Sequence, residues 1–214
     1  MGYELRRVVP HPMKQYTFGE DSVWDAESVK IEEGKHYMVK AHSGKGKSTL
    51  IAYLYGLRND YDGSVSYTGK EMREISLTEK ATIRQRHLSI ALQDMRLFPK
   101  LTVKENLLLK NQLTDFTTWD KIQGMLERFG IGEKSEQLCG TLSLGQQQRV
   151  TLIRSLLQPF DFLLMDEPFS HLDIENQKIG CAMIREACEA TKGNVIIASL
   201  GEHYYFEIDE FITV

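Results

Sequence analysis

The fold is decided by one stretch of the sequence, Ala41-His42-Ser43-Gly44-Lys45-Gly46-Lys47-Ser48-Thr49. It follows a strand-like run at residues 37–39 and precedes a helical pattern whose apolar face is Leu50, Leu54 and Leu57. Glycines in such a place let successive backbone N–H groups converge on phosphate oxygens, and the N-terminus of the helix adds positive potential. We therefore expect a phosphate-binding loop in which Lys47 reaches the β- and γ-phosphates and Ser48 ligates Mg²⁺.

The stretch departs from the usual phosphate-loop pattern, G-x-x-x-x-G-K-[ST], only at its first position, where Ala41 stands. Alanine is harmless there if its φ is negative and costs of order 1 kcal/mol if a left-handed conformation is needed. The alternative interpretation is an ordinary surface turn rich in Gly and Lys. The register of Gly44, Gly46 and Lys47 behind a strand favours the phosphate loop.

A second informative stretch is the apolar run at residues 162–165, which ends in Asp166-Glu167. A continuous apolar run of this length is typical of a strand buried on both faces of a parallel sheet. The carboxyl ends of such strands are where open α/β sheets bind ligands. We expect Asp166 to hold Mg²⁺ through water and Glu167 to polarise the water that attacks a γ-phosphate. Alone the pair would more simply be a solvated edge, but a phosphate loop lies 119 residues upstream, counted from Lys47 to Asp166.

Strand-like and helical patterns alternate along the rest of the chain. The first 40 residues hold short β-like runs, residues 59–63 form a turn signal, and residues 88–92 resemble another strand. Helices are expected at 103–110, at 118–129, from Ser143 onward and at 174–190, with a buried strand at 195–198. The pattern predicts the α/β class, with a mainly parallel sheet and an N-terminal antiparallel β region. Residues 1–93 and 159–214 would form this core, and residues 94–158 an inserted helical subdomain.

Composition and charge exclude several classes of protein. The 214 residues carry a net charge of −4, so the broad positive field of a nucleic-acid-binding protein is absent and no nucleic-acid partner is expected. No apolar run approaches the roughly 18 residues of a membrane-spanning helix, and the first residues do not form a secretory signal. The three cysteines form no C-x-x-C pair, which favours reduced thiols and a cytoplasmic location; they are Cys139, Cys181 and Cys188.

A third stretch, Leu142-Ser143-Leu144-Gly145-Gln146-Gln147-Gln148-Arg149, points to a family. Its serine precedes Asp166 by 23 residues, and the accompanying motifs are Gln93, Asp166-Glu167-Pro168 and Ser170-His171-Leu172-Asp173. Together these motifs resemble the ATPase subunit of an ABC (ATP-binding cassette) transporter. The resemblance runs in the family's motif order from Phe18 to the end of the chain. The compact size and residues 97–107 look most like the small stand-alone ATPases of the lipoprotein-release, macrolide-export and cell-division types.

The resemblance implies that two subunits sandwich two ATP molecules head to tail, as a homodimer or a heterodimer. Residues 43–49 of one subunit would hold the nucleotide, and Ser143, Gly145 and Gln146 of the other would contact it. An anion site at a helix N-terminus is physically sensible for a γ-phosphate. Ser143 could also simply form a capping box with Gln146. The two roles are compatible, because bound ATP would replace the internal cap.

Three further residues receive roles from the resemblance. Phe18 would stack on adenine, with Tyr16 as its rival and an ordinary core aromatic as the alternative. Gln93 would act in catalysis and sense the γ-phosphate and Mg²⁺, unless it is merely an exposed loop residue. Asp173 would couple the two sites, although capping of the following helix would also explain an aspartate there.

The chain departs from the family pattern at two other places. Leu144 replaces the first glycine of a Gly-Gly pair and puts a bulky side chain at the expected dimer face. Where the family has a histidine that contacts the γ-phosphate, this chain has Leu200, which cannot form hydrogen bonds. His203 could take the place of that histidine, or it could be a surface residue. Loss of such a group is costly in rate, so ATP binding and dimerisation are better supported than fast hydrolysis.

The leading hypothesis is therefore an ATP-binding and ATP-hydrolysing subunit that dimerises around Mg·ATP. It would drive a separate integral membrane permease from the inner face of the cell membrane, as a peripheral cytoplasmic protein. The alternative is a degenerate or regulatory ATP-binding subunit with little hydrolysis, because of Leu200. A DNA-repair ATPase would need a long coiled coil for which residues 47–166 leave no room, and a soluble phosphate-loop kinase would not explain residues 142–149.

Overall fold

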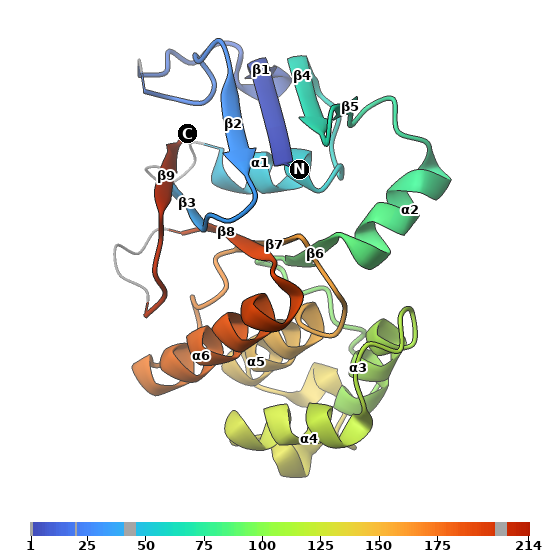
Figure 1. Cartoon of the computed structure of the whole chain (residues 1–214). Helices are drawn as coiled ribbons and strands as arrows, with labels where there is room; N and C mark the ends of the chain where they lie inside the picture. Colours follow the sequence, from blue (N-terminus) through green and yellow to red (C-terminus); the bar gives the residue numbers. More distant parts are fainter. Residues whose placement is uncertain (1, 20, 41–45, 200–204) are drawn as a thin grey trace.

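The computed structural model describes residues 2–19, 21–40, 46–199 and 205–214 (Figure 1). Within them, none of the helices combines the length and the apolar composition that a bilayer-crossing segment needs. Several residues singled out from the sequence lie outside the described ranges: Ala41, Ser43, Gly44, Lys45, Leu200 and His203.

A five-stranded sheet forms the centre of the molecule, and all of its paired strands are parallel. Its order is β6-β7-β8-β3-β9. The predicted strands at 37–39, 88–92, 162–165 and 195–198 all belong to it. The strands are β3 (Tyr37–Lys40), β6 (Leu88–Ala91), β7 (Phe162–Asp166), β8 (Asn194–Ala198) and β9 (Glu210–Thr213).

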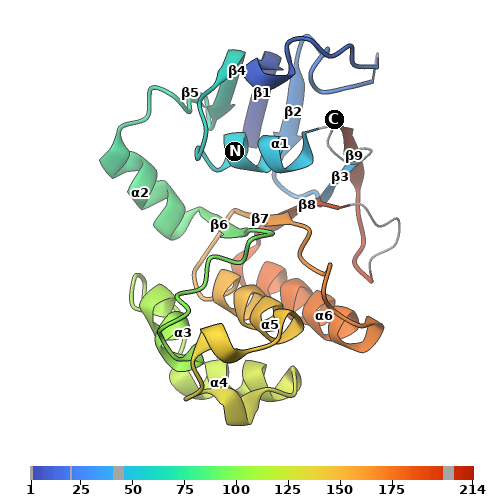
Figure 2. The same cartoon turned by 180° about the vertical axis from the view of Figure 1, so that it is seen from behind.

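A second sheet is antiparallel and lies over the first, with α1 between the two (Figures 1 and 2). Its order is β2-β1-β4-β5, and Leu5 of the central strand pairs with Val29 on one side and Val65 on the other. The predicted N-terminal antiparallel region is therefore present. The strands are β1 (Gly2–Pro10), β2 (Val29–Glu32), β4 (Tyr61–Tyr67) and β5 (Lys70–Glu71).

Six α-helices and three short 3-10 helices complete the described part of the chain. The observed bounds agree within two residues with the predictions at 103–110, 118–129 and 174–190. The α-helices are α1 (Lys47–Leu54), α2 (Leu77–Arg86), α3 (Val103–Asn111), α4 (Trp119–Arg128), α5 (Leu144–Ser155) and α6 (Ile174–Thr191). The 3-10 helices are η1 (His11–Met13), η2 (Gly132–Lys134) and η3 (Cys139–Thr141).

Two local predictions were wrong. The turn predicted at 59–63 is partly strand, because Tyr61 pairs with Pro10 of β1 and buries its ring, which is 1% exposed. Helix α1 ends at Leu54, so Leu57 is not on its apolar face and is 40% exposed. The outcome at Tyr61 depends on pairing with a distant strand, which the local pattern does not show. Helix α1 ends for a local reason, because Gly56 adopts a left-handed φ of 70° and the Leu57 N–H donates back to the Ala52 carbonyl oxygen at 2.8 Å.

Buried side chains gather on both faces of the parallel sheet. Along β7, Phe162 and Leu164 face the antiparallel sheet and α1, whereas Leu163 and Met165 face α3, α4, α5 and α6. This alternation follows from the two-residue period of a strand, and it explains why the run is apolar throughout. The cluster below the sheet contains residues of α3, α4 and α5 together with residues of β7, β8 and α6. The division into a core and a subdomain at 94–158 stays a prediction.

The parallel arrangement positions the polar residues. The carboxyl ends of β3, β6 and β7 lie at one edge of the sheet, because neighbouring parallel strands run in the same direction. Residues 41–46 and α1 follow β3, Gln93 follows β6, and Asp166 is the last residue of β7. Three segments that are far apart in the sequence thus start from the same edge of the sheet.

Gly63 provides a test of the antiparallel sheet. Its φ is +80°, and an ideal Cβ there would lie 2.2 Å from the Arg7 carbonyl oxygen, opposite the register shift between Arg6 and Val9. We expect Gly63→Ala to lower the free energy of unfolding in urea by about 3 kcal/mol, from left-handed strain and overpacking together. The matched control is Gly69→Ala, where φ is +83° but nothing lies within 4 Å of the added carbon. It should cost only about 1 kcal/mol, and equal losses at both positions would contradict the argument.

Candidate functional site

A cleft at the carboxyl edge of the parallel sheet brings together four residues that the sequence predicted to share one site. Ser48, Thr49, Gln93 and Asp166 all line this cleft, whose volume is about 500 Å³. They come from the start of α1, the segment after β6 and the end of β7. The other lining residues are Ala52, Leu57, Arg58, Leu92, Asp94 and Arg96.

The described end of the predicted phosphate loop leads directly into α1. Gly46 is the N-cap residue with φ 102°, a left-handed conformation that favours glycine, and Lys47 is the buried first residue of the helix. An ideal Cβ on Gly46 would lie 3.1 Å from Trp24 Nε1 and 3.2 Å from Met13 Sδ. Gly46 is thus packed closely against two side chains that the sequence did not single out.

Asp166 is the most buried acidic side chain at the site. It is 5% exposed, and its Oδ1 atom has no hydrogen-bond partner among the described residues. Burial raises the pKa of Asp166 above its ordinary value, while the Ser48 hydroxyl and the charge of Lys47 oppose that rise. A buried carboxylate oxygen without a partner, beside a serine hydroxyl, is a donor set that fits a hard cation such as Mg²⁺.

Glu167 directly follows β7 and has an unusual backbone. Its φ is 47°, a left-handed conformation that non-glycine residues rarely adopt. Its N–H donates to the Ala198 carbonyl oxygen at 2.8 Å, and the Ser199 hydroxyl donates to its Oε2 atom at 3.3 Å. Ser199 is 3% exposed and was not among the predicted site residues. Its only signal in the sequence is its place immediately after a buried strand.

Gln148 is a second residue that the sequence analysis missed. It is 3% exposed, and its side-chain amide donates to the Glu167 carbonyl oxygen at 3.0 Å and to Ser170 Oγ at 3.2 Å. Its Oε1 atom accepts from the His171 N–H at 2.7 Å. Helical spacing relative to the apolar Leu152 would have placed Gln148 on the buried face of its helix. A glutamine on a buried face must find polar partners, but the sequence does not say which.

The stretch around Ser143 begins α5 with the expected capping box. Ser143 Oγ accepts from the Gln146 N–H at 3.3 Å, and Gln146 Oε1 accepts from the Ser143 N–H at 3.0 Å. Leu144 is 57% exposed. The residues that line the cleft do not include Ser143, Gly145 or Gln146. Within the described ranges, the tip of α5 therefore does not contribute to this chain's own cleft.

The backbone of the segment after Gln93 is held by hydrogen bonds from α5. Met95 and Arg96 have φ values of 57° and 46°, two consecutive left-handed residues. Arg154, near the end of α5, donates to the carbonyl oxygen of Arg96 at 2.8 Å and to that of Met95. Gln93 itself is exposed at the mouth of the cleft. Helix α5 thus holds backbone on both sides of the site.

Phe18 and Tyr16, the two candidates for stacking on adenine, do not line the cleft. Phe18 is half-buried and packs against the core of the antiparallel sheet, and Tyr16 is 52% exposed. Asp173 is the N-cap of α6, where it accepts from the Asn176 N–H at 2.9 Å. That backbone hydrogen bond lowers the pKa of Asp173. The adenine and coupling roles stay predictions.

Comparisons with known proteins agree on one family. The family model described as "ABC transporter" matches residues 25–170. The chain is 32% identical over 168 residues to a macrolide export ATP-binding/permease protein MacB of Bdellovibrio bacteriovorus, an alignment covering 77% of this chain and 26% of MacB. It is 33% identical over 196 residues to a phosphonates import ATP-binding protein PhnC of Rhizobium johnstonii, covering 86% of this chain and 69% of PhnC.

A solved structure has the same fold. A dimeric post-hydrolysis state of the ATP-binding cassette MJ0796, bound to ADP and Pi, superimposes with a TM-score of 0.73 at 23% identity. The match covers 93% of this chain and 88% of that one.

Proposed function

The chain belongs to the ABC transporter family as an ATP-binding ATPase cassette, and from this membership we propose that it hydrolyses ATP within a dimer to drive a separate membrane permease. The observation that carries the proposal is the convergence of Ser48, Gln93 and Asp166 on one cleft. These are a hydroxyl, an amide and a buried carboxylate, which are the groups that a metal-bound triphosphate needs.

The residues predicted from the sequence have separate roles in this proposal. Lys47, with the N–H groups of residues 43–46 and of the first turn of α1, would hold the β- and γ-phosphates. Asp166 and Ser48 would hold Mg²⁺, which when bound supplies positive charge beside the phosphate oxygens. Gln93 would contact the γ-phosphate side from the segment after β6. Phe18 is our candidate for the adenine contact.

Glu167 would orient and deprotonate the attacking water. Its Oε2 atom is held by the Ser199 hydroxyl at 3.3 Å, which fixes the direction of the carboxylate. General-base catalysis by a positioned carboxylate contributes about 10²- to 10⁴-fold to a rate. Glu167 is therefore the residue to which we assign most of the chemical step.

A second subunit would complete the site. Ser143, Gly145 and Gln146 stand at the tip of α5 but do not line this chain's own cleft, and a helix N-terminus with exposed donors is suited to a γ-phosphate. We propose that they contact the nucleotide of a second ABC ATPase subunit, with Asp173 beside them. One relative is named for macrolide export and another for phosphonate import, so we propose a permease on the inner face of the membrane without naming its cargo.

The concentration dependence of phosphate release tests this proposal. Because the site needs two chains, the rate per chain should rise with protein concentration and vanish when EDTA removes Mg²⁺. A hundredfold excess of ATP over its Kd should also stabilise the fold by about 2.7 kcal/mol, and Lys47→Ala should abolish both effects. Binding without turnover would overturn the proposed hydrolysis and support the regulatory alternative suggested by Leu200. No binding at all would overturn both.

A further inference from the structure

We propose that Gln148 is a positioning residue for ATP hydrolysis, which holds the strained backbone of Glu167 and ties it to the tip of α5. The inference rests on the proposed function, because it concerns how this chain aims its own general base. Gln148 is buried, and its three hydrogen bonds all join it to residues 167–171.

The backbone of Glu167 needs to be held. A left-handed φ of 47° is unfavourable for a residue with a side chain, and Pro168 restricts this position further. Such a conformation persists only where the surroundings impose it. The N–H of Glu167 is held by the Ala198 carbonyl at 2.8 Å. Its carbonyl oxygen accepts from the Gln148 amide at 3.0 Å, from Ser170 Oγ at 3.2 Å and from the Ser170 N–H at 3.4 Å. If Gln148 is removed, one of these restraints on the carbonyl is lost and another is weakened.

Gln148 is suited to this task because it uses both ends of its amide. The NH₂ group donates to Glu167 O and to Ser170 Oγ, and the oxygen accepts from the His171 N–H. A glutamate could keep the acceptor but would lose the donors, and a methionine of similar shape would lose both. The side chain is buried, so water cannot readily replace the lost partners.

The same helix carries the tip that faces a second subunit in the proposed dimer. Ser143 caps α5, and Gln148 lies five residues further along, about 7.5 Å at the rise of an α-helix. Between them, an ideal Cβ on Gly145 would lie only 2.8 Å from the His171 carbonyl oxygen. The first turns of α5 and residues 167–171 are therefore in direct contact. A displacement of the helix tip by the partner's nucleotide would move the backbone of Glu167.

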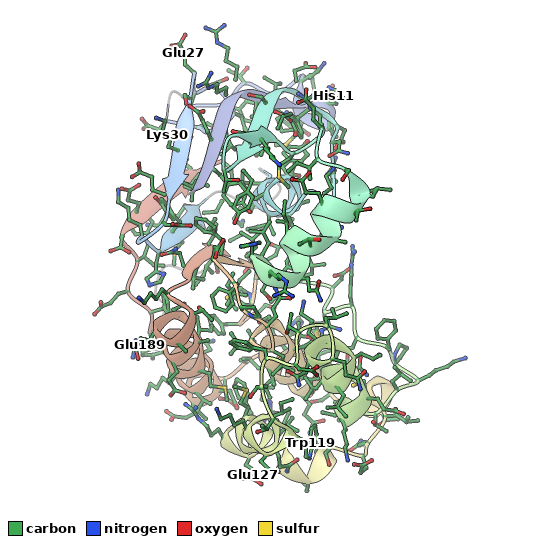
Figure 3. All side chains as sticks on the ribbon, turned by 45° about the vertical axis from the view of Figure 1, so that its right-hand side comes forward. His11, Glu27, Lys30, Trp119, Glu127 and Glu189 are labelled. Atoms are coloured by element: carbon green, nitrogen blue, oxygen red, sulfur yellow. The ribbon has the colours of Figure 1, made fainter. Side chains whose placement is uncertain are left out.

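The test compares Gln148 of α5 with Gln123 of α4, because the side-chain amide of each donates to a backbone carbonyl oxygen at 3.0 Å. Gln123 of α4 also donates to a carbonyl oxygen at 3.0 Å, that of Gly132, but it lies in the helix that bears Trp119 and Glu127, at the end of the molecule far from the antiparallel sheet (Figures 1 and 3). We expect Gln148→Met to lower kcat by about a hundredfold, the cost of a misplaced catalytic group, with KM for ATP within about twofold. Gln123→Met should leave both constants unchanged.

A second measurement separates positioning from a general loss of structure. In the Glu167→Gln background, Gln148→Met should leave ATP-dependent dimerisation, measured by sedimentation, within about twofold of the single variant, because the general base is already absent. Gln148→Glu keeps the size of the side chain and the acceptor for His171, and it should show the same loss of kcat if the methionine variant does not fold.

The outcomes are distinct. An unchanged kcat in Gln148→Met or Gln148→Glu would overturn the inference, as would a parallel loss of ATP affinity and dimerisation. The proposed function fails in a different experiment, namely when the unsubstituted chain releases no phosphate from Mg·ATP. That result would overturn both proposals, whereas normal turnover in the unsubstituted chain and in both Gln148 variants would overturn only this one.

Discussion

Replacing Glu167 by glutamine should reduce ATP turnover at least about a hundredfold while leaving ATP binding intact. An amide cannot take a proton from water at neutral pH, and a positioned general base is worth about 10²- to 10⁴-fold. The glutamine oxygen can still accept from Ser199, so the shape of the site is retained. Because formation of the ATP-bound dimer would no longer be followed by hydrolysis, size-exclusion chromatography in Mg·ATP should show a dimer that persists.

The matched control is Glu189→Gln on the exposed face of α6, labelled in Figure 3. It removes the same charge at a distance from the cleft and should leave turnover and oligomeric state unchanged. Full turnover in the Glu167 variant would mean that another group activates the water. The role that we assign to the carboxylate after β7 would then be wrong.

Replacing Gly145 by alanine should be the most disruptive small change in α5. The added carbon would lie 2.8 Å from the backbone carbonyl oxygen of His171, so the helix or residues 167–171 must move. Overpacking of this kind costs about 1–3 kcal/mol of folding free energy. Since these residues include Glu167, we also expect kcat to fall about a hundredfold, as it does when a catalytic group is displaced by an ångström.

Gly124→Ala is the control for this change, because Gly124 also lies inside a helix but has nothing within 4 Å of the added carbon. Alanine there should stabilise the protein by about 1 kcal/mol through helix propensity. Urea unfolding of the two variants should therefore give shifts of opposite sign. A gain of stability at both positions would show that α5 and residues 167–171 are not in close contact in solution.

The family resemblance drawn from the motifs is confirmed by the comparisons, and the predicted fold class is confirmed with it. Most strands of the parallel sheet could be predicted because each is a short apolar run with a clear boundary. The capping box at Ser143 could also be predicted, since a cap depends on residues only three positions apart. Helix α2 was missed because Lys80 is its only buried residue, so it has no apolar periodicity to detect.

The chemistry that is available, and its order along the chain, could be predicted from the sequence: a phosphate loop, a glutamine, a signature stretch and an acidic strand end. These patterns are local, because each depends on residues that are close in the chain. That Ser48, Gln93 and Asp166 share a site was also predicted, but that they line one cleft which excludes Ser143 follows from the folded arrangement. It alone revealed Ser199 and Gln148 as the partners of Glu167. Those contacts join residues 19 to 32 positions apart, and their geometry follows from how the sheet and α5 pack rather than from any spacing in the sequence.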